Sequence, residues 1–239
     1  MIRETAAELR DIAESCTDAA GYFPALYSRV TSQVAGSIDN SVFADGERMN
    51  VLATNFAEHY VQAWRNVIER PRCWQASWDV VGDDRLLIVQ HLLLGINAHV
   101  NYDLPQATAE AGRRAGDLSS VRGDFDAIND VLTTTSGLVL RDLDHVVRWA
   151  NEIAALGGGT VFNFSLQVAR DRAWQAAERL YAMDDDAQRA YLEELDEAVS
   201  VVAYLVTRPS LPVEILVRVA RRFEPHDARR VITALLGTA

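Results

Sequence analysis

The chain has 239 residues, of which 49% are hydrophobic, and this is enough to bury a substantial core, so we expect residues 1–239 to form a single domain. Its 34 acidic residues outnumber its 23 basic residues and give a formal net charge of −11. This balance argues against a nucleic-acid or anionic-membrane partner, because both require a basic surface.

Two cysteines, Cys16 and Cys73, are too few for a disulfide framework. The N-terminus lacks a signal-peptide pattern, and no apolar run approaches the roughly 20 residues of a membrane span. We therefore expect a cytoplasmic protein without membrane contact. All basic residues are arginines, a bias typical of GC-rich genomes such as those of actinobacteria.

Apolar residues recur mainly three and four positions apart, the spacing of amphipathic helices. The predicted fold class is therefore all-α, a single-domain bundle of many helices. The predicted helices are 3–15, 22–35, 47–69, 83–102, 105–115, 124–133, 137–155, 160–182, 187–207, 211–222 and 225–236. Prolines and glycines between them, such as Pro105, act as the expected helix breakers.

Charge is distributed unevenly in the last third of the chain. Residues 184–197 carry seven acidic side chains and Arg189, which is typical of a solvated helix face. The segment from Arg218 to Arg230 is rich in arginine. We expect the two segments to pair within the molecule; an anion-binding role for the arginines is the alternative.

The most informative stretch is the predicted helix 83–102, because it is strongly apolar and should lie at the centre of the bundle. At 100° per residue, His91, Gly95, His99 and Asp103 follow one stripe along this helix. Glycine costs about 1 kcal/mol there relative to alanine, so Gly95 indicates either a close helix approach or room for a ligand.

His99 and Asp103 are four residues apart and can meet each other or one metal ion. His91 lies about 12 Å from His99 along the helix axis, so it cannot share a metal ion with His99 without a bend. Other helices would have to supply further ligands, as they do in known helical-bundle metal sites. The candidates from elsewhere in the chain are His59, Asp124, Asp126, Asn129 and Asp171.

Three interpretations of this cluster remain open. Asn97, His99, Asn101 and Asp103 form a purely structural hydrogen-bonded seam, or they contribute to a metal site, or they form a metal-free acid–base or binding pocket. In the last case, we expect Asp103 to raise the pKa of His99. Trp74 and Trp78 are candidates for the wall of such a pocket.

Several strings of this sequence carry a family resemblance: Gly95-x-Asn97-Ala98-His99-x-Asn101-x-Asp103-Leu104-Pro105, Asp124-Phe-Asp126-x-Ile128-Asn129 and Ala169-Arg170-Asp171-x-Ala173-Trp174. Together with Phe43-Ala-Asp45 and Asn55-Phe-Ala-x-x-Tyr60, they resemble an uncharacterised, largely bacterial family, domain of unknown function 5995. The resemblance implies no activity. It directs attention to Asn97, His99, Asn101, Asp103, Asp126, Asn129, Arg170, Asp171 and Trp174.

The working hypothesis is a small-molecule enzyme, a hydrolase or lyase, whose site lies inside the bundle. The catalytic candidates are His99, Asp103, Asn97, Asn101 and Arg170. The metal-ligand candidates are His99, Asp103, His91, His59, Asp126 and Asp171. The expected cofactor is a divalent metal: iron, manganese, magnesium or zinc. If the ligands are limited to the residues that carry the family resemblance, His99 is the only histidine among carboxylates, which favours iron, manganese or magnesium over structural zinc.

Two alternatives remain: a metal-free cyclase or tailoring enzyme, and a non-catalytic ligand-binding or interaction protein. The expected partners are a small molecule and, from the prevalence of dimers among bacterial proteins, a second copy of the chain.

Overall fold

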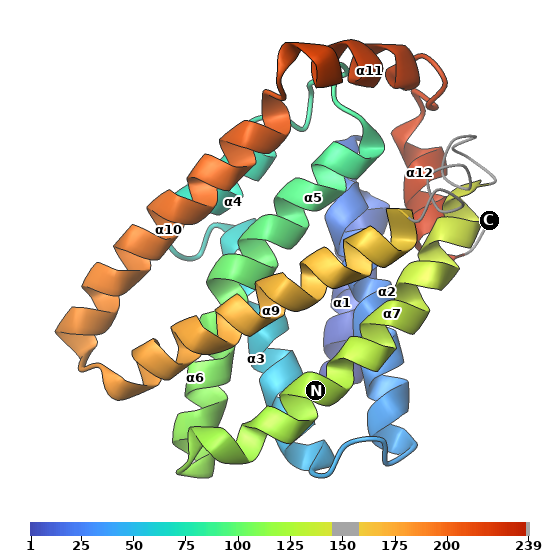
Figure 1. Cartoon of the computed structure of the whole chain (residues 1–239). Coiled ribbons are helices and arrows are strands. Elements are labelled where there is room, and N and C mark those ends of the chain that lie inside the picture. Colours follow the sequence, from blue (N-terminus) through green and yellow to red (C-terminus); the bar gives the residue numbers. More distant parts are fainter. Residues whose placement is uncertain (145–157, 238–239) are drawn as a thin grey trace.

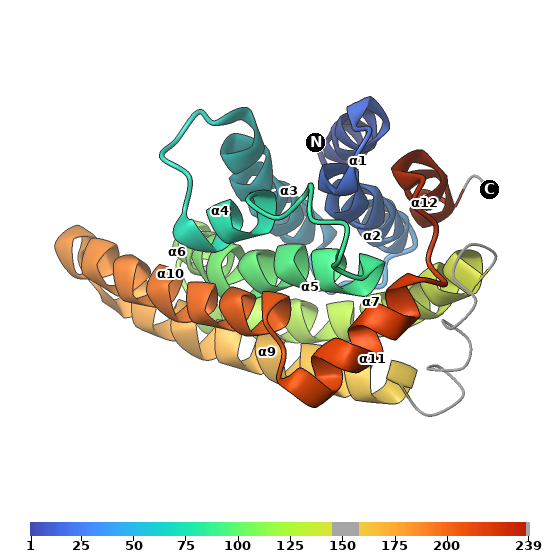
Figure 2. The same ribbon diagram turned by 90° about the horizontal axis from the view of Figure 1, so that it is seen from above.

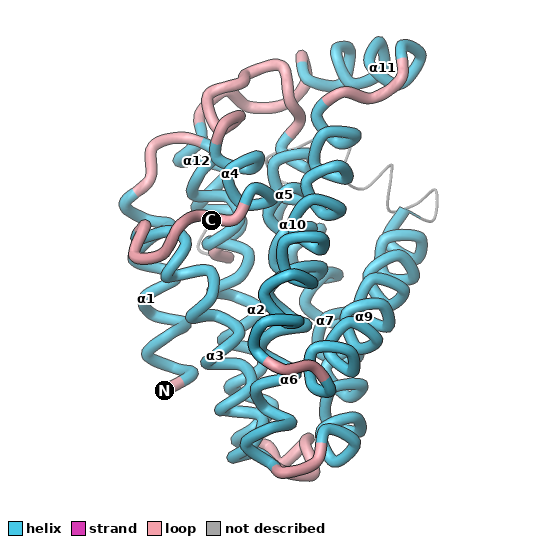
Figure 3. Tube along the Cα trace, turned by 90° about the vertical axis from the view of Figure 1, so that its left-hand side faces the viewer, coloured by secondary structure: helices cyan, strands magenta, loops and turns pink. Residues whose placement is uncertain are grey.

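The computed structural model describes residues 1–144 and 158–237, and within these ranges the regular elements are all helices, which confirms the all-α class (Figures 1 and 3). The helices are α1 (Ile2–Ser15), α2 (Tyr22–Asp39), α3 (Gly46–Arg65), α4 (Arg72–Trp78), α5 (Ile88–Ala98), α6 (Leu104–Ala115), α7 (Arg122–Asp144), α9 (Gly158–Ala182), α10 (Asp185–Thr207), α11 (Leu211–Arg221) and α12 (Ala228–Leu235). Two 3₁₀ turns, η1 (Ala19–Gly21) and η3 (Leu118–Val121), and one π-helical turn, η2 (His99–Asp103), complete the elements. None of the described helices combines the length and apolarity needed to cross a bilayer.

Aspartates begin several of these helices. The side chain of Asp45 accepts from the backbone N–H of Arg48, Asp184 accepts from Ala187, and Asp227 accepts from Arg229. Each bond satisfies a donor that the first helical turn leaves unpaired. These caps fix the starts of α3, α10 and α12.

The predicted central helix lies inside the bundle, with α5, η2 and α6 forming one continuous column. The column is packed against α2, α3, α4, α9 and α10 (Figures 1 and 2). Its start differs from the predicted residue 83, because regular helix begins only at Ile88. The apolar residues Ile88, Leu92 and Leu94 are buried, as expected for a helix with neighbours on several sides.

Pro105 does not break this column, contrary to its predicted role. A proline inside an α-helix donates no hydrogen bond, and its ring collides with the carbonyl four residues earlier, here that of Asn101. The chain widens into the π-turn η2 directly before Pro105, and Leu104 N–H bonds to His99 O. The wider turn absorbs the proline, so the helix continues to Ala115.

Other helix predictions also need correction. The segment 72–78 forms α4, although the sequence analysis predicts no helix there. The predicted helices 124–133 and 137–155 merge into α7 up to Asp144, and the rest of the second lies outside the described residues. The predicted helix 47–69 ends at Arg65, because Asn66 adopts a left-handed conformation.

The acidic segment and the C-terminal arginines do not pair, which corrects the expectation of charge matching within the molecule. Across the described parts of both segments, no ion pair joins them: Arg189 pairs with Asp186, and Arg218 pairs with Glu214. Asp184 is the N-cap of α10, whereas α11 follows the C-terminal end of α10 (Figure 1). One acidic residue, Asp196, is buried and accepts from the backbone N–H groups of Arg72 and Cys73, so it fixes the start of α4.

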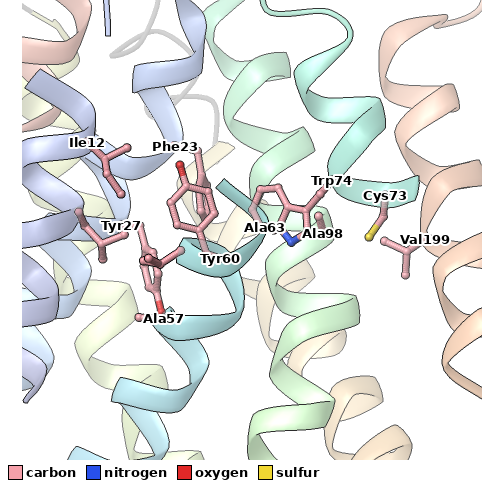
Figure 4. Close-up of a cluster of buried hydrophobic side chains, with 12 residues drawn as sticks. Ile12, Phe23, Tyr27, Ala57, Tyr60, Ala63, Cys73, Trp74, Ala98 and Val199 are labelled. Carbon is pink, nitrogen blue, oxygen red and sulfur yellow. The ribbon is translucent and has the colours of Figure 1, made fainter. Parts of the chain in front are cut away.

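Gly95 serves close helix packing, one of the two roles expected for it. A Cβ atom built at Gly95 would lie 2.5 Å from the ring of Phe23 on α2. The Phe23 ring belongs to an aromatic core with Tyr27, Tyr60 and Trp74 (Figure 4). The missing side chain therefore lets α2 approach α5 and place its aromatic residues beside the column.

Substitution of Gly95 tests this packing. We expect Gly95→Ala to lower the free energy of unfolding by about 1–3 kcal/mol, because the methyl group displaces Phe23 in a filled core. In the matched control Gly36→Ala, also inside a helix, the new Cβ meets no atom within 4 Å. That control should stabilise the protein by about 0.5–1 kcal/mol. Urea denaturation measures both, and an equal response of the two variants would contradict the packing argument.

Glu224 anchors the start of the column. Its carboxyl oxygen accepts from the backbone N–H of Ile88 at 2.9 Å, while its other oxygen is buried without a partner in the described structure. Burial raises the pKa of Glu224 to about 7, against the lowering effects of the Ile88 hydrogen bond and the Arg221 charge. The folded protein therefore holds this proton more tightly than the unfolded chain.

This pKa predicts a pH-dependent effect of Glu224→Gln. The wild-type protein loses stability as the pH rises from about 4.5 to about 7, because the folded state must then ionise a buried carboxyl group. Glutamine keeps an acceptor for Ile88 without the charge. We expect the variant to be more stable than wild type at pH 8 by up to about 3 kcal/mol, at about 1.4 kcal/mol per pKa unit.

At pH 5 the difference should be less than about 1 kcal/mol, because Glu224 is then mainly protonated in the folded protein and only partly ionised in the unfolded chain. Glu214→Gln is the matched control: it removes an exposed ion pair with Arg218 and should change stability by less than about 1 kcal/mol at either pH. Chemical denaturation at both pH values measures these effects. A Glu224→Gln variant less stable than wild type at pH 8 would contradict the prediction.

Candidate functional site

The centre of the candidate site is a buried pair formed by His99 and Asp103. His99 Nδ1 lies 2.9 Å from Asp103 Oδ2, and the two residues are only 3% and 2% exposed. Both belong to the π-turn η2, four residues apart, as the sequence spacing predicts. Trp74 on α4 donates its indole Nε1–H to the same carboxyl group, at 3.0 Å from Oδ2. Both donors therefore meet at Asp103 Oδ2, and Trp74 Nε1 also lies 3.3 Å from Oδ1.

Aromatic rings enclose the imidazole of His99. Phe56 on α3 stacks on it with ring centroids 3.6 Å apart and planes 6° apart. Tyr27 and Phe23 on α2 approach with centroid distances of 4.3 and 5.4 Å. The pair is therefore shielded from water mainly by aromatic side chains.

The second ring nitrogen of His99, Nε2, makes no hydrogen bond with the described residues. With Nδ1–H directed to Asp103, the neutral imidazole carries a lone pair on Nε2. Nε2 is buried and has no hydrogen-bond partner among the described residues. Burial lowers the pKa of His99 and outweighs the raising effects of the Asp103 hydrogen bond and charge. Asp103 therefore raises the pKa of His99, as expected from the sequence, but burial lowers it by more, so the folded protein favours neutral His99.

A second histidine–carboxylate pair lies next to the first. His59 Nε2 on α3 is 3.6 Å from Glu110 Oε1 on α6, and both side chains are partly exposed. Burial lowers the pKa of His59, but Glu110 and the charge of Asp103 outweigh it, so the pKa lies above its ordinary value. The charge of His59 in turn lowers the pKa of His99. The two pairs are thus electrostatically coupled, with the two histidines shifted in opposite directions.

Asn97 and Asn101 do not belong to this site. Asn97 donates to the backbone carbonyl of Val199 on α10 at 2.9 Å, and Asn101 donates to Asn97 Oδ1 at 3.0 Å. Residues two positions apart point to opposite sides of a helix, so the asparagines face α10 while His99 faces α2 and α3. The predicted single polar seam is therefore two separate networks, and the catalytic assignment of the two asparagines loses its structural basis.

His91 lies elsewhere, at a narrow crevice between η1, α3 and α4. The crevice has a volume of about 10 Å³ and is lined by Phe23, Tyr60, Trp74, Trp78 and His91, among others. This is room for about one water molecule. Trp74 and Trp78 do wall this small space, as the sequence suggests. Burial lowers the pKa of His91, whose ring packs edge-on against Tyr22.

The remaining candidates form a junction between α7 and α9. Arg170 is buried, donates to Asn129 Oδ1 at 2.8 Å and lies over the ring of Phe125. Arg122 pairs with both Asp126 and Asp171, at 2.8 and 3.4 Å. These contacts hold two helices together, and none of them joins the residues around His99. The assignment of Arg170 as a catalytic residue therefore lacks support from its position.

The predicted metal-ligand set is also divided. Its members are His59, His91, His99, Asp103, Asp126 and Asp171. His99 and Asp103 form the buried pair, and His59 pairs with Glu110. His91 lines the crevice, and Asp126 and Asp171 lie at the junction between α7 and α9. Within residues 1–144 and 158–237, no three His, Cys, Asp or Glu side chains converge as a metal site requires. Asp124 instead accepts from the backbone of Ala44 and Asp45.

Several residues that contact the two histidine–carboxylate pairs could not be assigned to the site from the sequence. Trp74 is 29 positions from Asp103, and Phe56 and Glu110 come from helices that meet only in the folded chain. Phe56 lies in the string Asn55-Phe-Ala-x-x-Tyr60 that carries the family resemblance, whereas Glu110 has no local signal that distinguishes it from ordinary helix residues. The one usable signal was the position of Trp74 near Trp78 in a possible pocket wall.

These features define an all-helical protein with a buried histidine–aspartate pair on a π-turn of its central helix. The chain belongs to the family of unknown function DUF5995, whose model matches residues 2–209. No curated protein and no solved structure matches the chain.

The opposite pKa directions of the two histidines can be measured directly. We expect His99 to remain neutral, with its proton on Nδ1, below pH 6.5, and His59 to titrate above pH 6.5. Because the unfolded chain protonates His99 near pH 6.5 and the folded protein does so lower, His99 makes the free energy of unfolding fall as the pH drops below 6.5. Long-range ¹H–¹⁵N NMR of the imidazoles gives both pKa values and the tautomers.

Glu110→Gln is the control for this measurement. It should lower the pKa of His59 and leave the tautomer of His99 unchanged. A proton on Nε2 of His99, or a charged His99 at pH 7, would show that the assigned geometry is wrong.

Proposed function

We propose that this protein is a metal-free acid–base enzyme that acts on a small, partly apolar molecule, with His99 Nε2 as the general base. The observation that carries the proposal is the unpartnered Nε2 atom of a buried histidine whose Nδ1 is held by Asp103. A carboxylate on one ring nitrogen fixes the tautomer and directs the lone pair of the other nitrogen at its target. Most buried polar atoms have partners, so an unpaired base nitrogen calls for an explanation.

The neighbouring pair supports a division of roles. A pKa below the ordinary value keeps His99 neutral and able to accept a proton, whereas a raised pKa lets His59 hold its proton to higher pH than an ordinary histidine. Two titratable groups driven apart in this way suit one base and one acid. His59, with Glu110 as its partner, is the acid in this proposal.

Access to Nε2 requires motion of the aromatic shell. His99 is 3% exposed and Phe56 covers one face of its ring. Phe56 itself is only partly buried, so it is the side chain that we expect to move when a ligand enters. A planar or apolar substrate would replace its ring contact with His99. Proton removal in a hydrolysis, elimination or cyclisation fits this environment, and these reactions need no metal.

A second candidate function is that of a non-catalytic interaction protein. The observation that favours it is a group of large apolar side chains that are exposed on α10 and α11. This function does not exclude the first. If the protein has only this function and no ligand reaches His99 and Asp103, the role of these two residues is structural.

The test compares His99→Gln with the matched control His91→Gln, which also replaces a buried histidine of low pKa. Two probes report on base catalysis: p-nitrophenyl acetate for hydrolysis and 5-nitrobenzisoxazole for proton removal. We expect kcat/KM to fall by about 10²-fold or more in His99→Gln and to change little in His91→Gln. Incubation with EDTA should leave the wild-type rate unchanged.

A parallel NMR titration with small aromatic esters and ketones shows whether any compound reaches the site. Binding beside His99 should move its ¹⁵Nε2 signal more than that of His91. If no compound moves this signal and the His99→Gln rates equal those of wild type, His99 and Asp103 are a structural pair and the proposal fails.

A further inference from the structure

The largest exposed apolar surface lies on α10 and α11, and we term it the α10–α11 face. Of the thirteen large hydrophobic side chains most exposed among the described residues, nine lie between residues 201 and 223, with exposed fractions of 44–74%. They are Val201, Val202, Tyr204, Leu205, Leu211, Ile215, Leu216, Val219 and Phe223. Single exposed apolar residues are ordinary, but nine of them on two consecutive helices indicate an interaction surface.

The α10–α11 face has the size of a specific protein interface. Nine large side chains at these exposed fractions present on the order of 900 Å² of surface, comparable to the roughly 800 Å² per partner of a standard interface. In Figure 1, α10 forms one edge of the molecule and α11 continues from its end, so both helices are accessible to a partner.

Charge along α10 indicates which partner fits. Glu197, Val201 and Leu205 follow one another at intervals of four residues on one exposed side of α10. Arg208 is the exposed C-cap residue directly after the helix, where its guanidinium donates to the Tyr204 hydroxyl and lies over the Tyr204 ring. An acid therefore lies at one end of the apolar row and a base at the other. Measured along the axis of α10, Glu197 and Arg208 lie at equal distances, about 8 Å, from the level midway between Val202 and Ala203.

Such a row is complementary to itself when it is reversed. A two-fold axis through the point between Val202 and Ala203 sets α10 antiparallel to its copy, with Val201 and Leu205 of both copies in contact. The same axis brings Glu197 of each copy opposite Arg208 of the other. Self-complementarity of this kind is what an interface between identical subunits requires.

We propose that the α10–α11 face binds a second copy of this chain, through antiparallel pairing of the two α10 helices about this axis. Charge matching inside one molecule is not the role of the acidic segment, because no ion pair in the described part of the chain joins it to the arginines of α11. A lipid surface fits less well, because exposed Glu193, Glu194 and Glu197 would face the anionic headgroups. This proposal is independent of the proposed function of His99.

The first test is the oligomeric state of the full chain by analytical ultracentrifugation between 1 and 100 µM. We expect a dimer for wild type, and for Leu205→Glu a dissociation constant at least about thirtyfold higher, because a charge then enters the centre of the interface. Val67→Glu is the matched control: Val67 is 70% exposed but lies outside the face, so this variant should remain a dimer. Circular dichroism and thermal unfolding should be unchanged in both variants.

A charge exchange tests the antiparallel geometry. Glu197→Arg and Arg208→Glu should each weaken the dimer by about tenfold, and the double variant should recover most of the loss, because opposite charges meet again across the axis. Two single effects that simply add in the double variant would overturn this geometry. A monomeric wild type at 100 µM would overturn the proposal altogether, as would binding of the monomer to vesicles of neutral and anionic lipid through the same face.

Discussion

The site depends on one interaction, the double donation to Asp103 from Trp74 and His99. Trp74 comes from α4 and His99 from the π-turn of the central column, so this carboxyl group joins these two elements. Trp74 and Asp103 are 29 positions apart in the chain. Neither donor reaches water, and a loss of the acceptor would leave two buried N–H groups unpaired. The orientation of the His99 ring, and therefore the direction of its free nitrogen, follows from this contact.

The elements around Asp103 are held by further buried carboxylates. Asp196 on α10 fixes the start of α4 and hence the position of Trp74, while Glu224 fixes the start of α5. Pro105 stands directly after the π-turn that carries His99 and Asp103. The proline accounts for the π-turn, so the π-turn by itself does not indicate catalysis. The feature that indicates a function is the unpartnered Nε2 atom of His99.

Periodicity predicted the helical class and the central position of the apolar helix, because both follow from which side chains avoid water. The pairing of His99 with Asp103 also followed from local spacing. The sequence could not show that Asn97 contacts Val199, or that Arg122 joins Asp126 to Asp171, since these contacts depend on how distant helices meet. The raising effect of Asp103 on the pKa of His99 was predicted, but the larger lowering effect of burial was not, because the local pattern reveals the carboxylate and not the stacked ring of Phe56.

Helix α10 connects the two proposals physically. Its inner side holds Asp196, which positions α4, and the Val199 carbonyl, which accepts from Asn97. Its outer side carries the exposed row between Glu197 and Arg208. Pairing of two α10 helices would bury the outer side and restrain the helix that supports Trp74. The same helix therefore carries the proposed interface on one side and, through Asp196, α4 and Trp74, the support of Asp103 on the other.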